Sequence, residues 1–191
     1  MASKPGERKL QILQTLAGML EKPSAEKITT AALAAKLDVS EAALYRHFAS
    51  KAQMFEGLID FIEQSVFTLI NQITEREPPG REQAARIVSM LMSFAEKNPG
   101  MTRVMVGDAL VYENERLQSR MNQFFDKIEA TLRQSLRDAA AIDGSATPTV
   151  DAQVRAAVLT AFVVGRIQRF ARSGFRKAPS EHLESAVALM L

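Results

Sequence analysis

Residues 28–48 have the sequence ITTAALAAKLDVSEAALYRHF, which predicts two short helices joined by a three-residue turn. Thr29 and Ser40 are natural N-caps, because a hydroxyl accepts from the free N–H groups of a first helical turn. Four apolar residues are spaced to share one small core: Leu33, Leu37, Val39 and Leu44. The second helix is then free to expose its other side chains, as a helix in the major groove must. The stretch is therefore predicted to be a helix-turn-helix.

The predicted turn has Asp38 at the position where glycine is common. Aspartate tolerates a left-handed backbone better than most residues, so the turn is expected to form at some cost in free energy. The alternative is a plain helical hairpin in a bundle. Against it, the two helices are short and polar for bundle helices, and they lie in the basic part of the chain.

The net charge of +2 over 191 residues is unevenly distributed. Residues 1–51 hold eight basic and five acidic side chains, whereas the other 140 residues hold 16 basic and 17 acidic ones. This excess in the N-terminal quarter is a weak indication of a polyanionic partner there.

Composition and motifs exclude several classes of protein. Hydrophobic residues make up 47% and charged residues 24%, which excludes a disordered or low-complexity chain. Without cysteine there is no disulfide, thiolate nucleophile or iron–sulfur site, and His47 and His182 are too few for a histidine metal site. No phosphate loop or nucleophile elbow is present, so we expect neither catalysis nor a cofactor. The longest uncharged apolar run, 156–165, is about half the ~20 residues that span a bilayer. With no secretory signal either, a cytoplasmic protein is expected.

Apolar residues recur every three or four positions and show no sustained alternation, which predicts an all-α protein of about nine helices. Ser50 and Gln53 have the spacing of a capping box at the start of the fourth helix. Residues 1–50 are expected to form the DNA-binding domain and residues 51–191 a helical body. Six helices are expected over 7–21, 50–74, 81–97, 113–140, 150–172 and 180–190. Two short helices are expected to begin near residues 29 and 40, and a third is expected to follow residues 99–100.

Residues 40–51, SEAALYRHFASK, with Phe55 following, resemble the signature of TetR-type regulators, and the resemblance covers about residues 7–67. It implies an all-α homodimer with a three-helix DNA-binding domain and a helical body. The last two long helices of the body would form a four-helix dimer interface. The residues expected to face the symmetry mate or the neighbouring helices there are Phe124, Ile128, Leu132, Val158 and Phe162.

Within those regulators, the chain is most similar to nucleoid occlusion factors, over residues 28–55, 94–103 (FAEKNPGMTR) and 113–125 (ENERLQSRMNQFF). This resemblance implies a nucleoid-associated protein that binds palindromic chromosomal sites, as a dimer or a dimer of dimers, and binds the tubulin-like division protein FtsZ. It would prevent Z-ring assembly over the nucleoid. A ligand-gated transcriptional repressor stays open as the alternative, and an enclosed small-molecule cavity in the body would favour it.

Ten residues of the helix-turn-helix region are expected to contact DNA: Thr29, Thr30, Ser40, Glu41, Ala42, Ala43, Tyr45, Arg46, His47 and Lys51. Arg46 and Lys51 should bind phosphate, with the threonines and the tyrosine as further backbone anchors. Glu41 and the two alanines should approach base edges, since a carboxylate accepts from a cytosine amino group and alanine touches a thymine methyl. His47 is expected at a phosphate or at the helix end.

Phe61 and Met90 each lie about 100° off the apolar stripe of their helix. From the residues alone, burial against other helices is the favoured interpretation. The resemblance to nucleoid occlusion factors instead implies a groove between the fourth and fifth helices that takes the apolar and acidic tail of FtsZ. Its expected contacts are Phe61, Met90, Ser93, Lys97, Asn98 and Met101, and Lys97 or Arg103 would meet the tail carboxylates. Leu69 stands where this resemblance expects a basic residue.

A basic run follows near the C-terminal end: Arg166, Arg169, Arg172, Arg176 and Lys177. A solvated face or ion pairs at the dimer interface is favoured over a role in attracting DNA or FtsZ.

Overall fold

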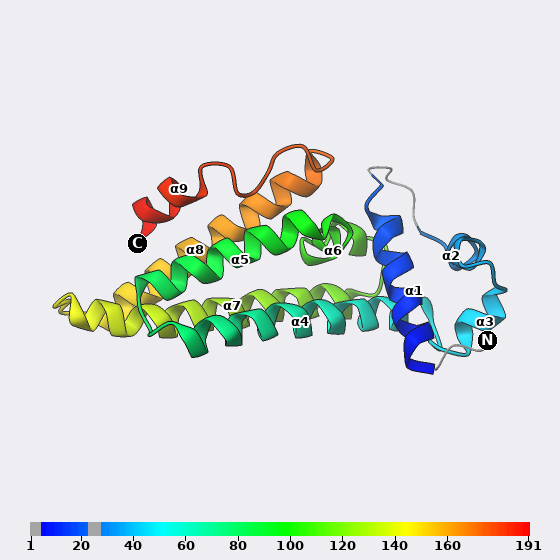
Figure 1. Cartoon of the computed structure of the whole chain (residues 1–191), viewed down its shortest axis with the longest axis horizontal. Coiled ribbons are helices and arrows are strands. Elements are labelled where there is room, and N and C mark those ends of the chain that lie inside the picture. The colour runs from blue at the N-terminus through cyan, green and yellow to red at the C-terminus, as the bar shows by residue number, and fades with distance from the viewer. Residues whose placement is uncertain (1–4, 23–27) are drawn as a thin grey trace. The chain divides into compact units, whose positions relative to one another are not determined.

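The computed structural model describes residues 5–22 and 28–191, and every regular element within these ranges is a helix (Figure 1). The all-α prediction is confirmed. Lys4 and Lys27, which contribute to the basic excess of the N-terminal quarter, lie outside the described residues. The elements are α1 (Pro5–Leu20), α2 (Thr30–Lys36), α3 (Glu41–Tyr45), α4 (Lys51–Arg76), α5 (Arg81–Lys97), α6 (Pro99–Met105), the 3₁₀ helix η1 (Asp108–Leu110), α7 (Glu115–Ile142), α8 (Pro148–Arg172) and α9 (Leu183–Met190).

Side-chain caps set the starts of the two longest helices. Ser50 Oγ accepts from the Gln53 N–H at 3.2 Å, and Gln53 Oε1 accepts from the Ala49 N–H at 2.9 Å. These reciprocal bonds confirm the predicted capping box at the start of α4. Helix α7 begins two residues later than predicted, because Asn114 Oδ1 accepts from the Arg116 N–H at 3.1 Å and caps the helix there.

The chain folds into two compact units. The first contains residues 1–62 and 99–121, and the second contains residues 63–98 and 122–191. This division differs from the predicted boundary at residue 50. Helix α4 begins just after that point and its residues up to Ile62 belong to the first unit, and a segment distant in sequence, 99–121, completes the unit that holds α2 and α3.

In the first unit, α1 contacts α2 and α6. Helix α6 approaches α1 so closely that a Cβ atom added to Gly100 would lie 2.0 Å from the Ala17 carbonyl oxygen. The Arg103 guanidinium donates to the carbonyls of Leu20 and Lys22 at 3.3 and 3.2 Å and pairs with Asp108 at 2.5 Å. Arg103 therefore binds the C-terminal end of α1, where free carbonyls favour a cation. This corrects the expectation that Arg103 is available for the carboxylates of a peptide.

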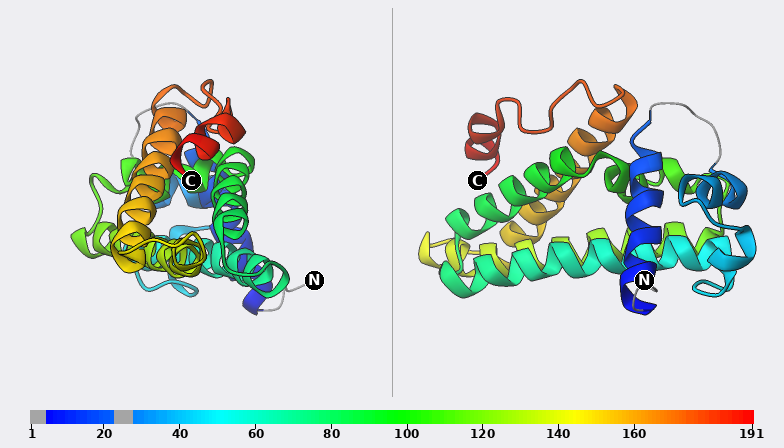
Figure 2. Two further views of the ribbon diagram at one scale, coloured as in Figure 1. Left: turned by 90° about the vertical axis from the view of Figure 1, so that its left-hand side faces the viewer. Right: turned by 45° about the vertical axis from the view of Figure 1, so that its right-hand side comes forward.

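In the second unit, α5 and α8 run side by side, and α8 also contacts α9 (Figure 2). Phe67 and Phe124 meet edge to face at 5.7 Å. One buried polar link joins α5 to α7, because Ser135 Oγ donates to Gln83 Oε1 at 2.5 Å. The fully buried apolar residues of α5, α7 and α8 include Ile87, Val88, Leu91, Phe124, Ile128, Leu132, Leu159, Val163 and Ile167.

Helix α9 begins three residues later than predicted. His182, just before it, has a left-handed backbone with φ of 54°, which a helix does not continue through. In the described part of the chain, no helix is long and apolar enough to cross a membrane.

Candidate nucleic-acid interface

Helices α2 and α3 are joined by a tight turn whose geometry matches the prediction. Asp38 has φ of 52°, which confirms the expected left-handed backbone. The Asp38 and Val39 N–H groups donate to the carbonyls of Ala35 and Ala34 at 3.2 and 3.0 Å, which closes the C-terminal end of α2. The turn fixes the direction in which α3 leaves α2.

The predicted caps and the centre of the small core are also present. Thr29 Oγ1 accepts from the Ala32 N–H at 3.1 Å and Ser40 Oγ from the Ala43 N–H at 3.3 Å. Leu33 and Leu44 are buried, whereas Leu37 and Val39 are only partly buried. Burial of Leu44 on one side of α3 leaves the opposite side of this short helix in solvent.

Three side chains form a hydrogen-bonded cluster across α2 and α3. Thr30 Oγ1 donates to Glu41 Oε2 at 2.5 Å, and the Tyr45 hydroxyl donates to Thr30 Oγ1 at 3.5 Å. Tyr45 keeps 45% of its surface exposed. The cluster orders three of the predicted DNA contacts before DNA arrives, and a carboxylate with two oxygens can still accept a further bond. Such order lowers the entropic cost of binding.

The other predicted DNA contacts occupy different environments. Ala42 and Arg46 are exposed, so a base edge and a phosphate can reach them. Ala43 and His47 are half-buried. Thr29 and Ser40 use their hydroxyl oxygens as caps, while their side chains remain exposed to solvent.

Lys51 has a partner within its own unit. Its ammonium lies 2.5 Å from Glu113 Oε1, with only 21% and 10% of the two side chains exposed, and it also lies 5.6 Å from the centre of the Phe55 ring. Moving this ammonium to a DNA phosphate would leave Glu113 charged and largely buried, which is costly. The structure therefore argues against the predicted phosphate contact of Lys51.

Sequence reasoning missed the residues that attach the start of α7 to α4. Arg116 pairs with Glu56 at 2.5 Å and Arg120 with Asp60 at 2.8 Å. In each pair the arginine lies on α7 and the carboxylate lies about 60 residues earlier in the chain, on α4. No spacing in the sequence therefore indicates the pair. The Glu113 partner of Lys51 was missed for the same reason.

The residues expected to contact FtsZ are divided between the two units. Phe61 and Met101 belong to the first unit and are half-buried. In the second unit Lys97 is exposed, and Met90, Ser93 and Asn98 are half-buried. The Asn98 amide donates to the Phe94 carbonyl at 2.8 Å at the end of α5. Their role in binding FtsZ stays a prediction.

Three of the residues expected to face either the symmetry mate or the neighbouring helices face the helices of their own chain. Phe124, Ile128 and Leu132 have no exposed surface, so a second copy can touch them only if the core opens. Of the two expected positions the structure supports the second: these three are core residues of the body. Val158 is 46% exposed and Phe162 is half-buried, so both remain accessible on α8.

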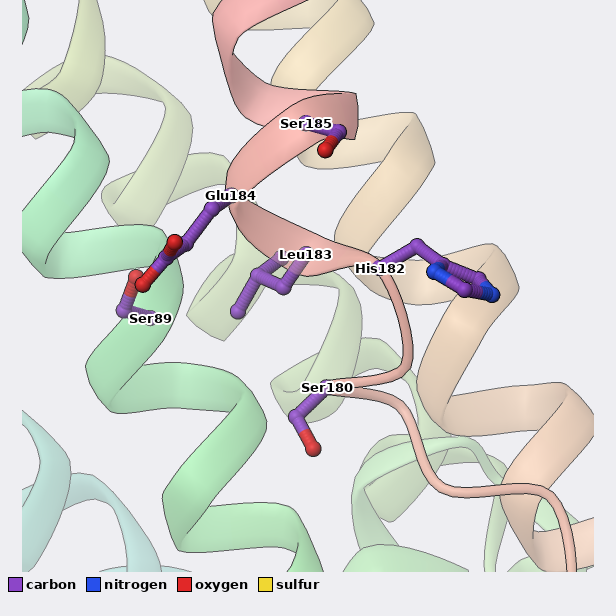
Figure 3. Close-up of a pocket in the computed structure, with 6 residues that line it drawn as sticks. All are labelled: Ser89, Ser180, His182, Leu183, Glu184 and Ser185. Atoms are coloured by element: carbon purple, nitrogen blue, oxygen red, sulfur yellow. The ribbon is translucent and has the colours of Figure 1, made fainter.

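A surface pocket of about 450 Å³ lies between α5 and the start of α9 (Figure 3). Ser89 and Glu184 point toward each other, while His182 points away from them. The lining is mostly polar: Ser89, Ser180, His182, Leu183, Glu184 and Ser185. Small-molecule sites are mainly apolar, so this pocket does not support ligand gating. Among the described residues there is no group of acidic or histidine side chains that could hold a metal ion.

Comparison with known families divides the chain into two matches. Residues 12–58 match the family described as bacterial regulatory proteins, tetR family. Residues 82–191 match the SlmA-like family described as tetracyclin repressor-like, C-terminal domain. The second match alone covers more than half of the chain.

Relatives of similar length align with nearly the whole chain. The nucleoid occlusion factor SlmA of Vibrio vulnificus is 49% identical over 189 residues, which are 98% of this chain and 96% of that protein. The nucleoid occlusion factor SlmA of Idiomarina loihiensis is 46% identical over 190 residues, or 100% and 96% of the two chains.

Solved structures confirm the architecture. The fatty acid degradation regulator FadR from Bacillus halodurans superposes with a TM-score of 0.79 at 12% identity, covering 100% of this chain and 97% of that one. The TetR family regulator PfmR from Thermus thermophilus gives 0.73 at 20% identity, covering 95% and 94%. At these identities the likeness concerns the fold alone.

Proposed function

The chain belongs to the tetR family of bacterial regulatory proteins and, within it, to the SlmA nucleoid occlusion factors, and we propose that it binds chromosomal sites as a homodimer and there blocks FtsZ assembly. Proteins of this family are DNA-binding regulators, not enzymes. The observation that carries the proposal is the 49% identity to a nucleoid occlusion factor over 98% of the chain, which includes the body as well as the helix-turn-helix.

DNA binding is assigned to the exposed side of α3 and the start of α2. Arg46 contributes a charge-assisted bond to phosphate, and Tyr45 and Thr30 anchor the backbone. Ala42 and Glu41 approach base edges in the major groove. The hydrogen bonds from Thr30 to Glu41 and from Tyr45 to Thr30 support this assignment, because they hold the reading surface in one arrangement.

Dimerisation is assigned to the exposed side of α8. Val150, Val154 and Val158 are 58%, 56% and 46% exposed and follow one another at intervals of four residues. Such spacing places them in a row on one side of the helix, with Phe162 continuing it. A row of exposed apolar side chains that a second copy can bury supports a two-fold interface. A dimer then presents two copies of α3 to a palindromic site.

FtsZ binding is assigned to the six residues that the likeness to nucleoid occlusion factors implies, with Phe61 and Met90 as the apolar anchors. Lys97 is exposed and supplies a positive charge for tail carboxylates. Methionine suits such a surface because its side chain adapts to an apolar partner. Leu69, which is 36% exposed in place of the expected basic residue, predicts a weaker electrostatic contribution here.

The test is a Phe61→Ala variant measured on one preparation for two activities. The first is its affinity for a palindromic DNA duplex. The second is its binding to FtsZ, together with the amount of FtsZ polymer that sediments when the DNA-loaded protein is present. Loss of an aromatic anchor costs about 2 kcal/mol or more of binding, which is tens of fold in affinity. FtsZ binding and polymer inhibition should fall together while DNA affinity holds, because α3 is unchanged.

Phe67→Ala is the matched control. Phe67 is also a half-buried aromatic residue of α4, and its ring packs on Phe124 rather than on the proposed FtsZ contact. It should lose stability but keep FtsZ binding. If Phe61→Ala lowers DNA and FtsZ binding alike, Phe61 is a core residue. If it lowers neither, the FtsZ assignment fails and a ligand-gated repressor becomes the better interpretation.

A further inference from the structure

The C-terminal end of α8 and the loop that follows it carry a concentrated positive charge. Between residues 166 and 177 the chain has five basic and no acidic side chains. Four of them are exposed and have no ion-pair partner among the residues that the structure describes. We call these four the α8 basic patch: Arg169, Arg172, Arg176 and Lys177.

The fifth basic residue, Arg166, has a different role. Its guanidinium donates to the carbonyls of Pro179, at 3.0 Å, and Glu181, and it lies 5.6 Å from the centre of the Phe162 ring. The segment after α8 turns back toward α9 (Figure 1), and Arg166 attaches it to the helix. The chain that follows the α8 basic patch is therefore held against α8 by these hydrogen bonds.

The loop of the patch is held in one conformation. Ser173 Oγ accepts from the N–H groups of Arg176 and Lys177 at 3.0 and 2.9 Å and donates to the Phe170 carbonyl at 2.8 Å. Phe175 has φ of 64°, an unfavourable backbone for a residue with a side chain, and its ring packs on Phe170 at 5.2 Å. Arg176 Nε donates to the Ser173 carbonyl at 2.9 Å. A costly, fixed conformation of this kind is typical of functional loops.

The helix dipole does not account for the whole patch. Cations in the last turn of a helix are stabilised by its free carbonyls, which explains Arg169 and Arg172. Arg176 and Lys177 lie beyond the end of α8, and each adds repulsion to the others. Four like charges on an ordered surface therefore favour an external anion.

We propose that the α8 basic patch binds an acidic peptide segment that also carries apolar residues. Arginine binds carboxylates with two parallel hydrogen bonds, and the ordered loop presents its cations in a fixed arrangement. Phe175 lies in the same loop as Arg176 and Lys177; its ring packs on Phe170 but stays half-buried, so its remaining surface can pack on an apolar side chain of the peptide. Duplex DNA presents phosphates to such a surface and keeps its bases stacked inside, so it offers no apolar group to this ring, and an acidic peptide fits better than duplex DNA. The patch shares no residue with the proposed DNA or FtsZ contacts.

The test uses the full-length protein and a short fluorescein-labelled peptide of alternating glutamate and leucine, with the glutamine version as the uncharged probe. The double variant Arg169→Gln/Arg172→Gln should weaken binding of the acidic peptide about tenfold at low salt, and so should Arg176→Gln/Lys177→Gln. The control, Lys127→Gln/Arg137→Gln, removes the same charge from exposed positions of α7 and should change affinity less than about twofold.

Three outcomes would overturn the proposal. Equal losses in the patch and control variants would show that the peptide responds only to net charge. A tenfold loss of affinity for a duplex without a palindrome, in the patch variants alone, would show that the surface binds nucleic acid. A change of sedimentation coefficient in the patch variants would place these residues at the dimer interface.

Discussion

The close approach of α1 and α6 predicts that Gly100→Ala damages the DNA-binding unit. The added Cβ would lie 2.0 Å from the Ala17 oxygen and 2.9 Å from its carbonyl carbon, so the two backbones must separate by about 1 Å. Forcing packed elements apart costs about 1–3 kcal/mol, and the bonds from Arg103 to the end of α1 would lengthen and weaken by about 1 kcal/mol each. Better helix propensity returns at most about 1 kcal/mol. We expect a net loss of about 3 kcal/mol.

For a protein of this size, that loss corresponds to a melting temperature about 6–12 °C lower, measured by circular dichroism or calorimetry. Gly18→Ala is the matched control: Gly18 lies on α1, the helix that Gly100 of α6 approaches, but nothing lies within 4 Å of its new Cβ, so the change should raise stability slightly. DNA affinity should fall only in the first variant. If Gly100→Ala melts at or above the temperature of the unmodified protein, the backbones of α1 and α6 are not in contact.

Three further changes test other parts of the structure. Asp38→Gly relieves the left-handed backbone of the turn and should raise the free energy of unfolding by about 0.5–1 kcal/mol, and a lower urea midpoint would contradict this. Arg46→Gln should reduce the salt dependence of DNA binding by about one unit, whereas Lys51→Ala, which removes the partner of Glu113, should lower stability and leave the salt slope unchanged. Val158→Asp should dissociate the dimer in sedimentation experiments, because it buries a carboxylate in an apolar interface, and a variant that stays dimeric would place the interface elsewhere.

Local chemistry made the helices predictable, and for α2, α3 and α4 their starts as well. A capping hydroxyl and its N–H donor are three residues apart, so Ser40 and Ser50 could be assigned from spacing alone. Asp38 could be assigned to the left-handed position because few other residue types tolerate it in a tight turn. These features are the ones that shape the helix-turn-helix.

Partners distant in the chain were not predictable. Lys51 and Glu113 are 62 residues apart, and nothing in the sequence distinguishes this lysine from one that faces DNA. Likewise, the apolar stripe of α7 indicates that Phe124 is buried but not whether its own chain or a second copy covers it. The first unit, with residues 99–121 added to the helix-turn-helix, could be found only from the folded arrangement.

The interrupted first unit has a consequence for synthesis of the protein. When α2 and α3 leave the ribosome, Gly100, Arg103 and Glu113 have not yet been translated. At bacterial elongation rates, the roughly 70 residues between Lys51 and residue 121 take on the order of 4–14 s. During that interval α1 lacks its packing partner and the Lys51 ammonium lacks its carboxylate. A nascent chain therefore completes its DNA-binding unit only after part of the body has been made. Products of premature termination before residue 121 should be poor competitors for chromosomal sites.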